Sequence, residues 1–360
     1  MSLPALRHNI ACVRAAVAPA GVLAVVKADA YGHGAVPVAR ALATGGAFAF
    51  GVATVEEAVE LRGGGVSAPV LVLGGVYSRS HDEVVGNELE AVVFDGGEVG
   101  RFAEAARRLG KKALVHVKVD TGMARLGVAP DGLLDLLGAI RRFPEVEVRG
   151  LLTHLASADE PDVMPTHAQL LRFATCLSAV EAAGARPPRV HVANTAGALR
   201  FPNSRYDLVR SGLALYGALP SPAVPDPGLM PALSIRTRVA AVRTVKSGDP
   251  VGYGGLWRAP RASRIATLPV GYADGYSRRL SNRASVLLRG RRAPVVGAVA
   301  MDMILVDASE SGADAGDSVT LIGEADGERI RVEELAAWAE TIPYEILCAL
   351  GRRMPRVYLE

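Results

Sequence analysis

The sequence predicts an α/β fold, with an N-terminal (β/α)8 barrel of the TIM type followed by a mostly-β C-terminal domain. Through the first two-thirds of the chain, short apolar runs rich in β-branched residues alternate with longer segments of helical period. A proline-rich stretch at residues 220–228 ends this alternation, and short runs separated by turn residues follow it. Alternating strands and helices are typical of parallel α/β barrels, whereas closely spaced short strands are typical of antiparallel sheets.

Eight apolar runs in the N-terminal part are the predicted barrel strands. Helical periodicity lies between them, most clearly at residues 55–62, 99–109, 132–142 and 166–183. A doubly wound open sheet is the alternative, but no G-x-G-x-x-G motif opens any of these units. We therefore expect barrel strands at residues 23–26, 48–52, 70–73, 91–94, 114–119, 148–152, 190–192 and 208–209.

The stiff stretch at residues 220–228 is where we expect the domain boundary, because proline-rich segments connect domains more often than they form elements. The predicted barrel domain covers residues 1–222, and the predicted β-domain covers residues 223–360. Within the second domain we expect one late helix at residues 332–340. The expected strands lie at residues 235–245, 264–269, 284–288, 294–299, 304–306 and 318–322.

Composition narrows the class of protein. The 360 residues are 50% hydrophobic and carry a formal net charge of only +3, without a lysine- or arginine-rich block. We therefore expect a large core and no nucleic-acid partner. The cysteines Cys12, Cys176 and Cys348 lie far apart without metal-ligand spacing, so we expect reduced thiols and no metal site. Neither a secretion signal nor a membrane-length apolar run is visible, which favours a cytoplasmic protein.

Lys27 ends the first apolar run and precedes a glycine-punctuated loop that carries Tyr31 and His33. Lysine is strongly hydrated and seldom ends a buried strand without a partner or a task. An amine at this position can lose its proton and form a Schiff base with an aldehyde. The alternative is that Lys27 merely ends the strand and extends its ammonium group into water.

Functional side chains of a TIM barrel gather just after the carboxyl ends of its strands. Loops after the last two strands often bind phosphate, and Gly212 leaves backbone N–H groups accessible there. A reactive lysine together with a phosphate site is what pyridoxal phosphate requires. The polar residues at these strand ends are Lys27, Arg125, His154, Asn194, Thr195 and Arg210.

Nine segments, in the right order and spread over essentially the whole chain, resemble those of alanine racemases. This family consists of fold-type III pyridoxal-phosphate enzymes, and any one of the segments alone would be a weak signal. The matching segments are residues 24–34, 119–127, 153–156, 191–196, 210–217, 251–254, 270–276, 297–302 and 341–358.

The resemblance implies a pyridoxal-phosphate-dependent racemase that interconverts L- and D-alanine and supplies D-alanine for bacterial peptidoglycan. It implies that Lys27 binds the cofactor and acts as one base, and that Tyr253 is the base on the opposite face. His154 and Arg210 would lie beside Tyr253, with Arg210 facing the pyridine nitrogen of the cofactor. Arg125 would contact the cofactor's phenolic oxygen and the substrate carboxylate.

The resemblance also implies a homodimer with shared active sites, because Tyr253, Met301 and Asp302 would reach the partner's barrel. Met301 and Asp302 would contact the substrate carboxylate. The alternation at residues 115–120 directs His116, Lys118 and Asp120 toward the barrel interior, and the resemblance makes Lys118 a possible carbamylated lysine that holds Arg125. The implied cofactor contacts, mostly to the phosphate, are Tyr31, Asn194, Thr195, Gly212, Leu213 and Tyr344.

Three departures from the family pattern are visible. Thr195 stands where many members have serine, and Met303 stands where glutamine is common. A strand that usually precedes the helix near Leu6 is not expected here, and residues 1–3 have the look of an expression remnant.

Three alternatives remain open at this point. A broader racemase of small amino acids, acting on serine as well as alanine, would carry the same residues. A fold-type III amino acid decarboxylase would use a catalytic cysteine, whereas Cys348 follows Tyr344 in a predicted helix and Tyr253 is present. A cofactor-binding homeostasis protein built on the same barrel would lack the C-terminal β-domain.

Overall fold

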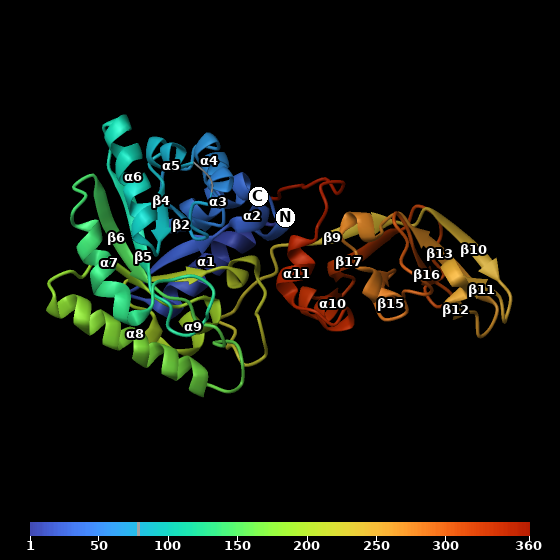
Figure 1. The fold of residues 1–360 in the computed structure, drawn as a ribbon. Helices are drawn as coiled ribbons and strands as arrows, with labels where there is room; N and C mark the ends of the chain where they lie inside the picture. Colours follow the sequence, from blue (N-terminus) through green and yellow to red (C-terminus); the bar gives the residue numbers. More distant parts are fainter. Residues whose placement is uncertain (78–79) are drawn as a thin grey trace. The chain divides into compact units, whose positions relative to one another are not determined.

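The computed structural model describes residues 1–77 and 80–360, which form two compact units (Figure 1). We call Pro4–Ala30 with Gly34–Met230 the barrel unit. We call Pro231–Glu360, together with Met1–Leu3 and Tyr31–His33, the C-terminal unit. Residues 31–33 thus follow Lys27 closely in the chain but pack with the C-terminal unit.

The barrel unit is built on eight parallel strands in the order β7-β6-β5-β4-β3-β2-β1-β8. Hydrogen bonds from the Asp207 amide to the Val190 carbonyl, at 3.0 Å, and from Arg210 to Ala193, at 2.9 Å, connect the two ends of this ladder. The predicted barrel is therefore confirmed, with small shifts at strand ends. The strands are β1 (Gly21–Val25), β2 (Ala49–Val52), β3 (Val70–Val72), β4 (Glu90–Val93), β5 (Ala113–Lys118), β6 (Val146–Leu152), β7 (Arg189–His191) and β8 (Leu208–Ser211).

Helices surround these strands (Figure 1), and the apolar strand residues are buried because both faces of a parallel sheet are covered. Helix starts carry the expected caps: Thr54 and Glu57 form a capping box, and the Asp95 carboxylate accepts a hydrogen bond from the Glu98 amide at 2.9 Å. The helices are α1 (Leu3–Val17), α2 (Lys27–Gly32), α3 (Ala35–Thr44), α4 (Val55–Gly63), α5 (His81–Gly86), α6 (Gly96–Leu109), α7 (Leu133–Ile140), α8 (Met164–Ala182) and α9 (Thr195–Arg200).

The C-terminal unit consists mainly of antiparallel strands. One sheet has the order β10-β13-β16, a second has the order β15-β14-β17-β18 with β9 paired to β17, and β11 pairs with β12. The elements are β9 (Ile235–Arg238), β10 (Ala241–Val245), β11 (Pro250–Val251), β12 (Trp257–Arg258), β13 (Ser263–Leu268), β14 (Ser285–Leu288), β15 (Arg291–Pro294), β16 (Ile304–Asp307), β17 (Ser318–Ala325), β18 (Glu328–Ile330), α10 (Val332–Trp338) and α11 (Pro343–Cys348).

Two expectations for this unit were wrong in detail. The single strand expected at residues 235–245 is two strands, because β9 pairs with β17 while β10 pairs with β13. The strand expected at residues 294–299 is only the end of β15, since Gly297 has a φ of +79° and breaks the extended backbone. A Cβ on Gly297 would lie 2.7 Å from the Val251 carbonyl oxygen, so this position needs glycine. The strands β11, β12 and β18 were not expected, whereas the helix expected to contain Tyr344 and Cys348 is α11.

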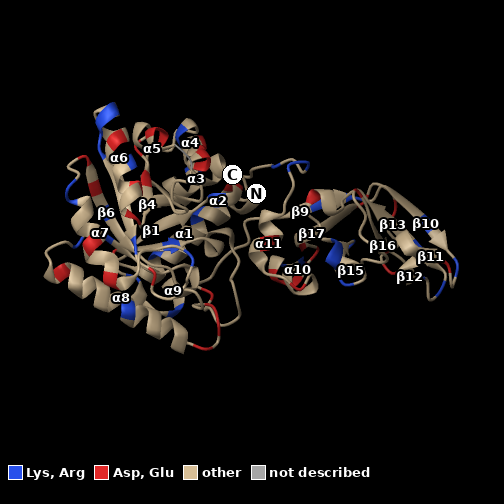
Figure 2. Ribbon diagram, in the orientation of Figure 1, with Lys and Arg blue, Asp and Glu red and all other residues tan. Residues whose placement is uncertain are grey.

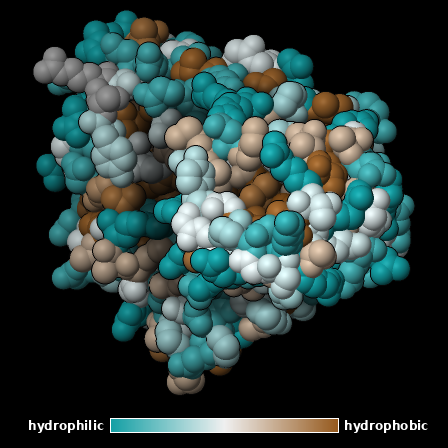
Figure 3. All heavy atoms as spheres, turned by 90° about the vertical axis from the view of Figure 1, so that its right-hand side faces the viewer, coloured by the Kyte–Doolittle hydropathy of each residue, from teal (hydrophilic) through white to brown (hydrophobic). Residues whose placement is uncertain are grey.

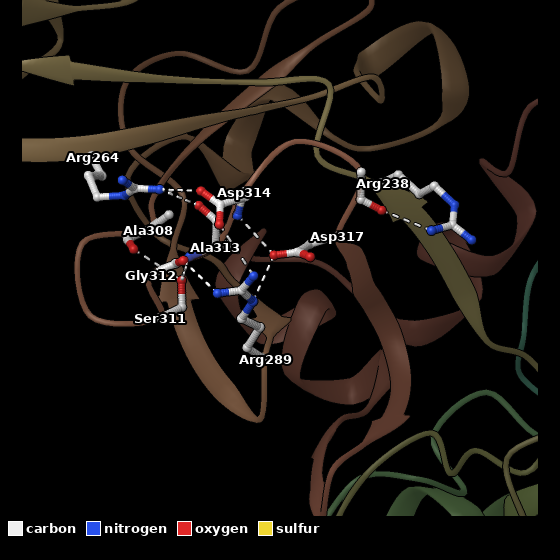
Figure 4. A network of polar contacts seen from close by, with 10 residues as sticks. Arg238, Arg264, Arg289, Ala308, Ser311, Gly312, Ala313, Asp314 and Asp317 are labelled. Carbon is white, nitrogen blue, oxygen red and sulfur yellow. Dashed lines mark hydrogen bonds and ion pairs between the residues drawn. The ribbon is translucent and has the colours of Figure 1, made fainter.

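Two arginines fix the loop between β16 and β17 (Figure 4). Arg264 donates to the Ala313 carbonyl at 2.7 Å and to the Asp314 carboxylate at 2.8 Å. Arg289 donates to the Gly312 carbonyl at 2.6 Å and pairs with Asp317 at 2.7 Å. Exposed ion pairs contribute little stability individually, but together these contacts determine the path of the loop.

Charged residues of both signs lie on two of the helices around β2 to β5. Basic and acidic residues are interspersed along α4 and α6, whereas α5 carries only the acidic Asp82 and Glu83 (Figure 2). Apolar patches are interrupted by hydrophilic residues on the face shown in Figure 3. None of the helices among the described residues is both long enough and apolar enough to span a membrane.

Candidate functional site

Lys27 lies two residues after the end of β1, beyond the buried Val26, and is itself exposed. The next four residues, Ala28 to Tyr31, have φ values of 51–53°, and Gly32 has a φ of 75°. The expected loop is therefore a turn of left-handed helix, which costs L-residues about 1–2 kcal/mol each. Strain of this kind is typical of functional sites and requires support from surrounding contacts.

Contacts with neighbouring segments of the barrel unit supply that support. The Glu57 carboxylate of α4 accepts a hydrogen bond from the Ala28 amide at 2.6 Å and another from the Ala53 amide at 2.7 Å. The Asp29 carboxylate accepts one from the Ala35 amide at 2.7 Å. The turn that follows Lys27 is thus tied to the starts of α3 and α4.

Tyr31 packs against Tyr344 of α11, with 5.9 Å between ring centroids. Burial raises the pKa of Tyr31, and the neighbouring Tyr344 and Cys348 raise it further, so its hydroxyl keeps its proton. Gly32 lies so close to α11 that an added Cβ would collide with the Leu347 carbonyl oxygen. The structure therefore brings together two of the predicted phosphate ligands, both in the C-terminal unit.

Arg210 of β8 is buried at the centre of the polar barrel interior. Its terminal nitrogens donate to the backbone oxygens of Thr153, His191 and Val192 at 2.7–2.8 Å. Nη2 also donates to Nδ1 of His154 at 3.1 Å. Burial lowers the pKa of Arg210 to about 10, so the guanidinium remains protonated at neutral pH.

His154 and Lys118 lie in the same positive environment. Burial lowers the pKa of His154 well below its ordinary value, and the charges of Arg210, Lys118, Arg125 and Lys27 lower it further. Burial and the charges of Arg210 and Arg125 lower the pKa of Lys118 to about 8. Five sequence-predicted residues thus act on one another electrostatically at this end of the barrel.

Polar groups after β7 and β8 form a second part of the barrel site. The Thr195 hydroxyl accepts a hydrogen bond from the Gly212 amide at 3.0 Å, so the exchange of serine for threonine keeps the oxygen in place. The buried Ser211 hydroxyl has no hydrogen-bond partner among the residues that the structure describes. Asn194 caps α9 by accepting from the Gly197 amide at 2.9 Å. Leu213 is buried beside Gly212.

The remaining predicted residues lie in the C-terminal unit. Tyr253 is 75% exposed and Met301 is 52% exposed, and both line a surface hollow with Asp302 and Met303. Asp302 pairs with Arg353 at 2.8 Å, and Arg353 also pairs with Asp274 at 3.0 Å. Tyr253, the expected second base, is therefore accessible to solvent. The ion pair between Asp302 and Arg353 was not predicted from the sequence.

Sequence reasoning missed the polar residues deeper in the barrel. Glu90, His116 and His191 are buried and hydrogen-bonded to one another. The alternation in β5 did direct His116 inward, together with Lys118. A charged residue at the start of a buried strand, as at Glu90, is the signal that could have revealed its partners.

Comparison of the sequence with protein families gives two matches that together cover nearly the whole chain. The family model for the alanine racemase N-terminal domain matches residues 1–220, and that for the alanine racemase C-terminal domain matches residues 232–358. The alanine racemase of Symbiobacterium thermophilum is 48% identical over 361 residues, covering 99% of this chain and 96% of that protein. That of Geobacter sulfurreducens is 44% identical over 366 residues, covering 100% and 96%.

Solved structures agree with this match and confirm the fold class. The crystal structure of alanine racemase from a D-cycloserine-producing Streptomyces lavendulae aligns with a TM-score of 0.96 at 38% identity, covering 100% of this chain and 96% of that one. The alanine racemase of Bacillus anthracis with bound L-Ala-P aligns with a TM-score of 0.92 at 36% identity, covering 100% and 94%. The chain therefore belongs to the alanine racemase family.

Proposed function

We propose that this protein binds pyridoxal phosphate and interconverts L- and D-alanine. The observation that carries this proposal is the setting of Arg210, which presents a charged group that cannot readily give up its proton. Both terminal nitrogens of the Arg210 guanidinium donate hydrogen bonds to acceptors of the protein. None of the hydrogen bonds that Arg210 makes with the described residues uses its Nε. That N–H is the donor we assign to the pyridine nitrogen.

The other groups of the barrel unit fit the same cofactor. Lys27 supplies an exposed amine for the aldehyde. The Gly212 amide donates to the Thr195 hydroxyl, whose own O–H remains a donor for the phosphate together with that of Ser211. The partnerless Ser211 hydroxyl is the kind of group that a ligand satisfies. When bound, pyridoxal phosphate stabilises negative charge on the α-carbon of an amino acid. A guanidinium beside the ring limits that stabilisation, which favours return of the proton.

Racemisation requires two bases on opposite faces of the substrate. We assign Nζ of Lys27 to one face and Oη of Tyr253 to the other. Tyr253 Oη removes the α-proton from one enantiomer and, in the reverse direction, donates a proton that forms this enantiomer. Lys27 Nζ removes and donates the α-proton of the other enantiomer. Arg125 and Asp302 with Met301 hold the substrate carboxylate, and Tyr31 and Tyr344 add to phosphate binding together with Leu213 and Asn194.

We further propose that the active protein is a homodimer in which residues 1–222 bind the cofactor and residues 223–360 complete the partner's site. The supporting observation is the group of exposed side chains that line the hollow at Tyr253, which includes Met301 and Met303. Exposed apolar clusters of this kind mark interfaces. In a twofold dimer Tyr253, Met301 and Asp302 of each C-terminal unit would serve the opposite barrel.

Lys118 is the proposed site of carbamylation. Its pKa of about 8 leaves a substantial fraction of neutral amine near neutral pH, and neutral amines react with carbon dioxide. The resulting carboxylate would neutralise part of the positive charge and accept hydrogen bonds from Arg125. Incubation with ¹³C-bicarbonate should give a carbamate resonance that Lys118→Met lacks, and identical spectra would exclude the modification.

We place this reaction in the cytoplasm, as a source of D-alanine for bacterial peptidoglycan. None of the cysteines Cys12, Cys176 and Cys348 forms a disulfide bond, as expected in a reducing compartment. Expression of the chain should allow a bacterium that lacks its own alanine racemases to grow without added D-alanine. Failure of a well-expressed chain to restore growth would count against this role.

The central experiment is spectroscopic and isotopic. The purified protein should show a visible absorption band that borohydride removes, with the cofactor then attached to Lys27 by mass spectrometry. In deuterated water both alanine enantiomers should gain α-deuterium, and a panel including serine would define the specificity. A colourless protein that takes up no cofactor would overturn the proposal.

A further inference from the structure

A continuous series of hydrogen-bonded polar side chains, four of them buried and two half-buried, runs through the interior of the barrel unit. Its members come from β4, β5, β7 and β8 and from the segment after β6, so residues far apart in the sequence meet there. In spatial order the series consists of Arg189, Glu90, His116, His191, Arg210 and His154.

Short contacts connect each neighbouring pair along the series. Glu90 lies 2.7 Å from Arg189 and 2.8 Å from Nε2 of His116. Nδ1 of His116 lies 2.8 Å from Nε2 of His191. Nδ1 of His191 lies 2.9 Å from Nη1 of Arg210. The last contact, from Arg210 to Nδ1 of His154, is 3.1 Å long.

Arg210 and Glu90 determine where every proton between them lies. A guanidinium can only donate, so Nδ1 of His191 must accept and its proton lies on Nε2. That proton is donated to Nδ1 of His116, whose own proton therefore lies on Nε2. A carboxylate can only accept, and Glu90 receives this last hydrogen bond. The hydrogen bonds all point the same way, from Arg210 to Glu90.

Burial favours this arrangement of neutral rings beside an ionised carboxylate. His116 is 1% exposed and His191 is fully buried, and burial lowers the pKa of both. Burial raises the pKa of Glu90, but hydrogen bonds from His116 and Arg189 outweigh it and hold the pKa below its ordinary value.

The backbone makes room for the contact between the two rings. The pairing of β5 with β6 shifts register between Val115 and His116, which places Gly150 opposite His116. A Cβ on Gly150 would collide with Nδ1 of His116, the atom that accepts from His191. Glycine at this position therefore permits the ring-to-ring hydrogen bond.

We propose that Glu90 and His116 are positioning residues for the racemase reaction, acting on Arg210 and His154 through the tautomer of His191. If His191 carried its proton on Nδ1, that N–H would face Nη1 of Arg210, which is also a donor. The guanidinium would then be displaced from its carbonyl acceptors. The consequence for catalysis rests on the role of Arg210 in the proposed function. The tautomers of the histidines follow from the hydrogen bonds alone and do not depend on that role.

The tautomers can be measured directly in the full-length protein without cofactor. ¹⁵N-labelled histidine distinguishes protonated from unprotonated ring nitrogens by NMR. We expect the proton on Nε2 in His116, His191 and His154 of the wild type. A proton on Nδ1 of His191, or a doubly protonated His191, would overturn the proposal whether or not the protein is an active racemase.

The variant Glu90→Gln should reverse the pattern. Arg189 will hold the amide oxygen, so the amide NH2 faces His116 and forces Nε2 of that ring to accept. His116 and His191 should then carry their protons on Nδ1. In the loaded enzyme we expect kcat to fall by about tenfold or more with a smaller change in KM and an altered pH profile, as for other residues that orient a functional group. Glu90→Asp, which keeps a carboxylate, should restore part of the activity.

Two further variants separate this role from simple loss of packing. Gly150→Ala keeps every polar group but displaces the His116 ring, so it should also disturb the His191 tautomer and kcat. Glu98→Gln removes another carboxylate of the barrel unit, one that is only 3% exposed and accepts from the Val76 amide at 3.2 Å. It should leave the three tautomers and the pH profile unchanged. If Glu90→Gln and Glu98→Gln behave alike, the proposal is wrong.

Discussion

Lys118 shows how the barrel changes the chemistry of a single residue. It is 6% exposed, and burial together with Arg210 and Arg125 lowers its pKa from 10.5 to about 8. Asp120 acts in the opposite direction but is outweighed. A lysine that would be a solvated cation elsewhere thus becomes an amine that deprotonates within reach of physiological pH.

This shift predicts a pH-dependent stability. Between pH 8 and 10.5 the unfolded lysine holds a proton that the folded one has lost, so stability rises with pH through this window. Relative to Lys118→Met, the wild type should gain up to about 3 kcal/mol in free energy of unfolding across it. Urea denaturation of both proteins without cofactor in carbon dioxide-free buffer measures this difference.

Below pH 8 the difference between the two proteins should be constant, because both the folded and the unfolded lysine are then protonated. Lys112, whose ammonium group donates to the Pro144 carbonyl in an exposed contact, offers a matched control. Lys112→Met measures the effect of losing a lysine as such, and the slope is attributed to Lys118 only where the two variants differ. A flat difference for Lys118→Met would mean that its amine is solvated.

Single residues differed in how far the sequence revealed them. Lys27, His154 and Arg210 were predicted because strand ends converge on one face of a parallel barrel. Glu90 and His191 were missed, because the roles of both depend on contacts with His116. His116 lies 26 residues from Glu90 and 75 residues from His191 in the sequence. Hydrogen bonds of this kind leave no local pattern.

At the scale of elements, the left-handed turn after Lys27 depends on α4. Glu57 both caps this helix and holds the turn, with one carboxylate oxygen on the Ala53 amide and the other on the Ala28 amide. A glutamine keeps only one acceptor oxygen, so one of these amides must lose its partner. Loss of such a bond costs about 1–3 kcal/mol.

We therefore predict that Glu57→Gln lowers the free energy of unfolding by about 1–3 kcal/mol and weakens cofactor retention at Lys27. Thermal denaturation and visible absorbance after dialysis measure the two effects. Thr54→Ala is the matched control, because it removes the cap on the Glu57 amide at a cost of about 1 kcal/mol but keeps the bond to Ala28. Equal cofactor loss in both variants would contradict a specific role for the carboxylate.

Elements were predictable where local pattern and packing agree. The barrel strands β1, β2 and β3 are short apolar runs, and both faces of such a sheet are buried. The expected strand at residues 294–299 failed because apolar composition does not reveal the positive φ of Gly297. The turn at residues 28–31 was equally hidden, since four L-residues adopt a left-handed conformation only under contacts from Glu57 and Asp29.

At the scale of the whole molecule, the predicted site residues are divided between two units. Lys27, Arg210 and His154 belong to the barrel unit, whereas Tyr253 and Asp302 belong to the C-terminal unit. The proposed dimer assigns them to different chains within each active site. That assignment can be tested with heterodimers whose two subunits carry different inactivating substitutions.

Heterodimers of Lys27→Ala and Tyr253→Phe subunits, purified with two different tags, should recover about half of the wild-type activity. One of their two sites combines an intact Lys27 with an intact Tyr253 from the other chain. Each homodimer alone should be strongly impaired. Racemisation of L-alanine, followed by the appearance of D-alanine, measures the recovery.

The matched control combines Lys27→Ala with Arg210→Lys, two defects in the same barrel. Each site of that heterodimer then contains one defective barrel, so no recovery is expected. If Lys27→Ala and Tyr253→Phe likewise fail to complement, the two bases come from the same chain and the shared-site dimer is wrong.

The sequence by itself determined the fold class, the order of the barrel strands and the residues at their carboxyl ends, because hydrophobic periodicity and strand-end position are local properties. Only the tertiary structure decided that the turn after Lys27 is left-handed and that Arg210 connects His154 to His191. These features depend on groups brought together from distant strands, where burial changes pKa values and each hydrogen bond constrains the next. The chemistry of Lys118 and the tautomers of the buried histidines therefore belong to the folded barrel.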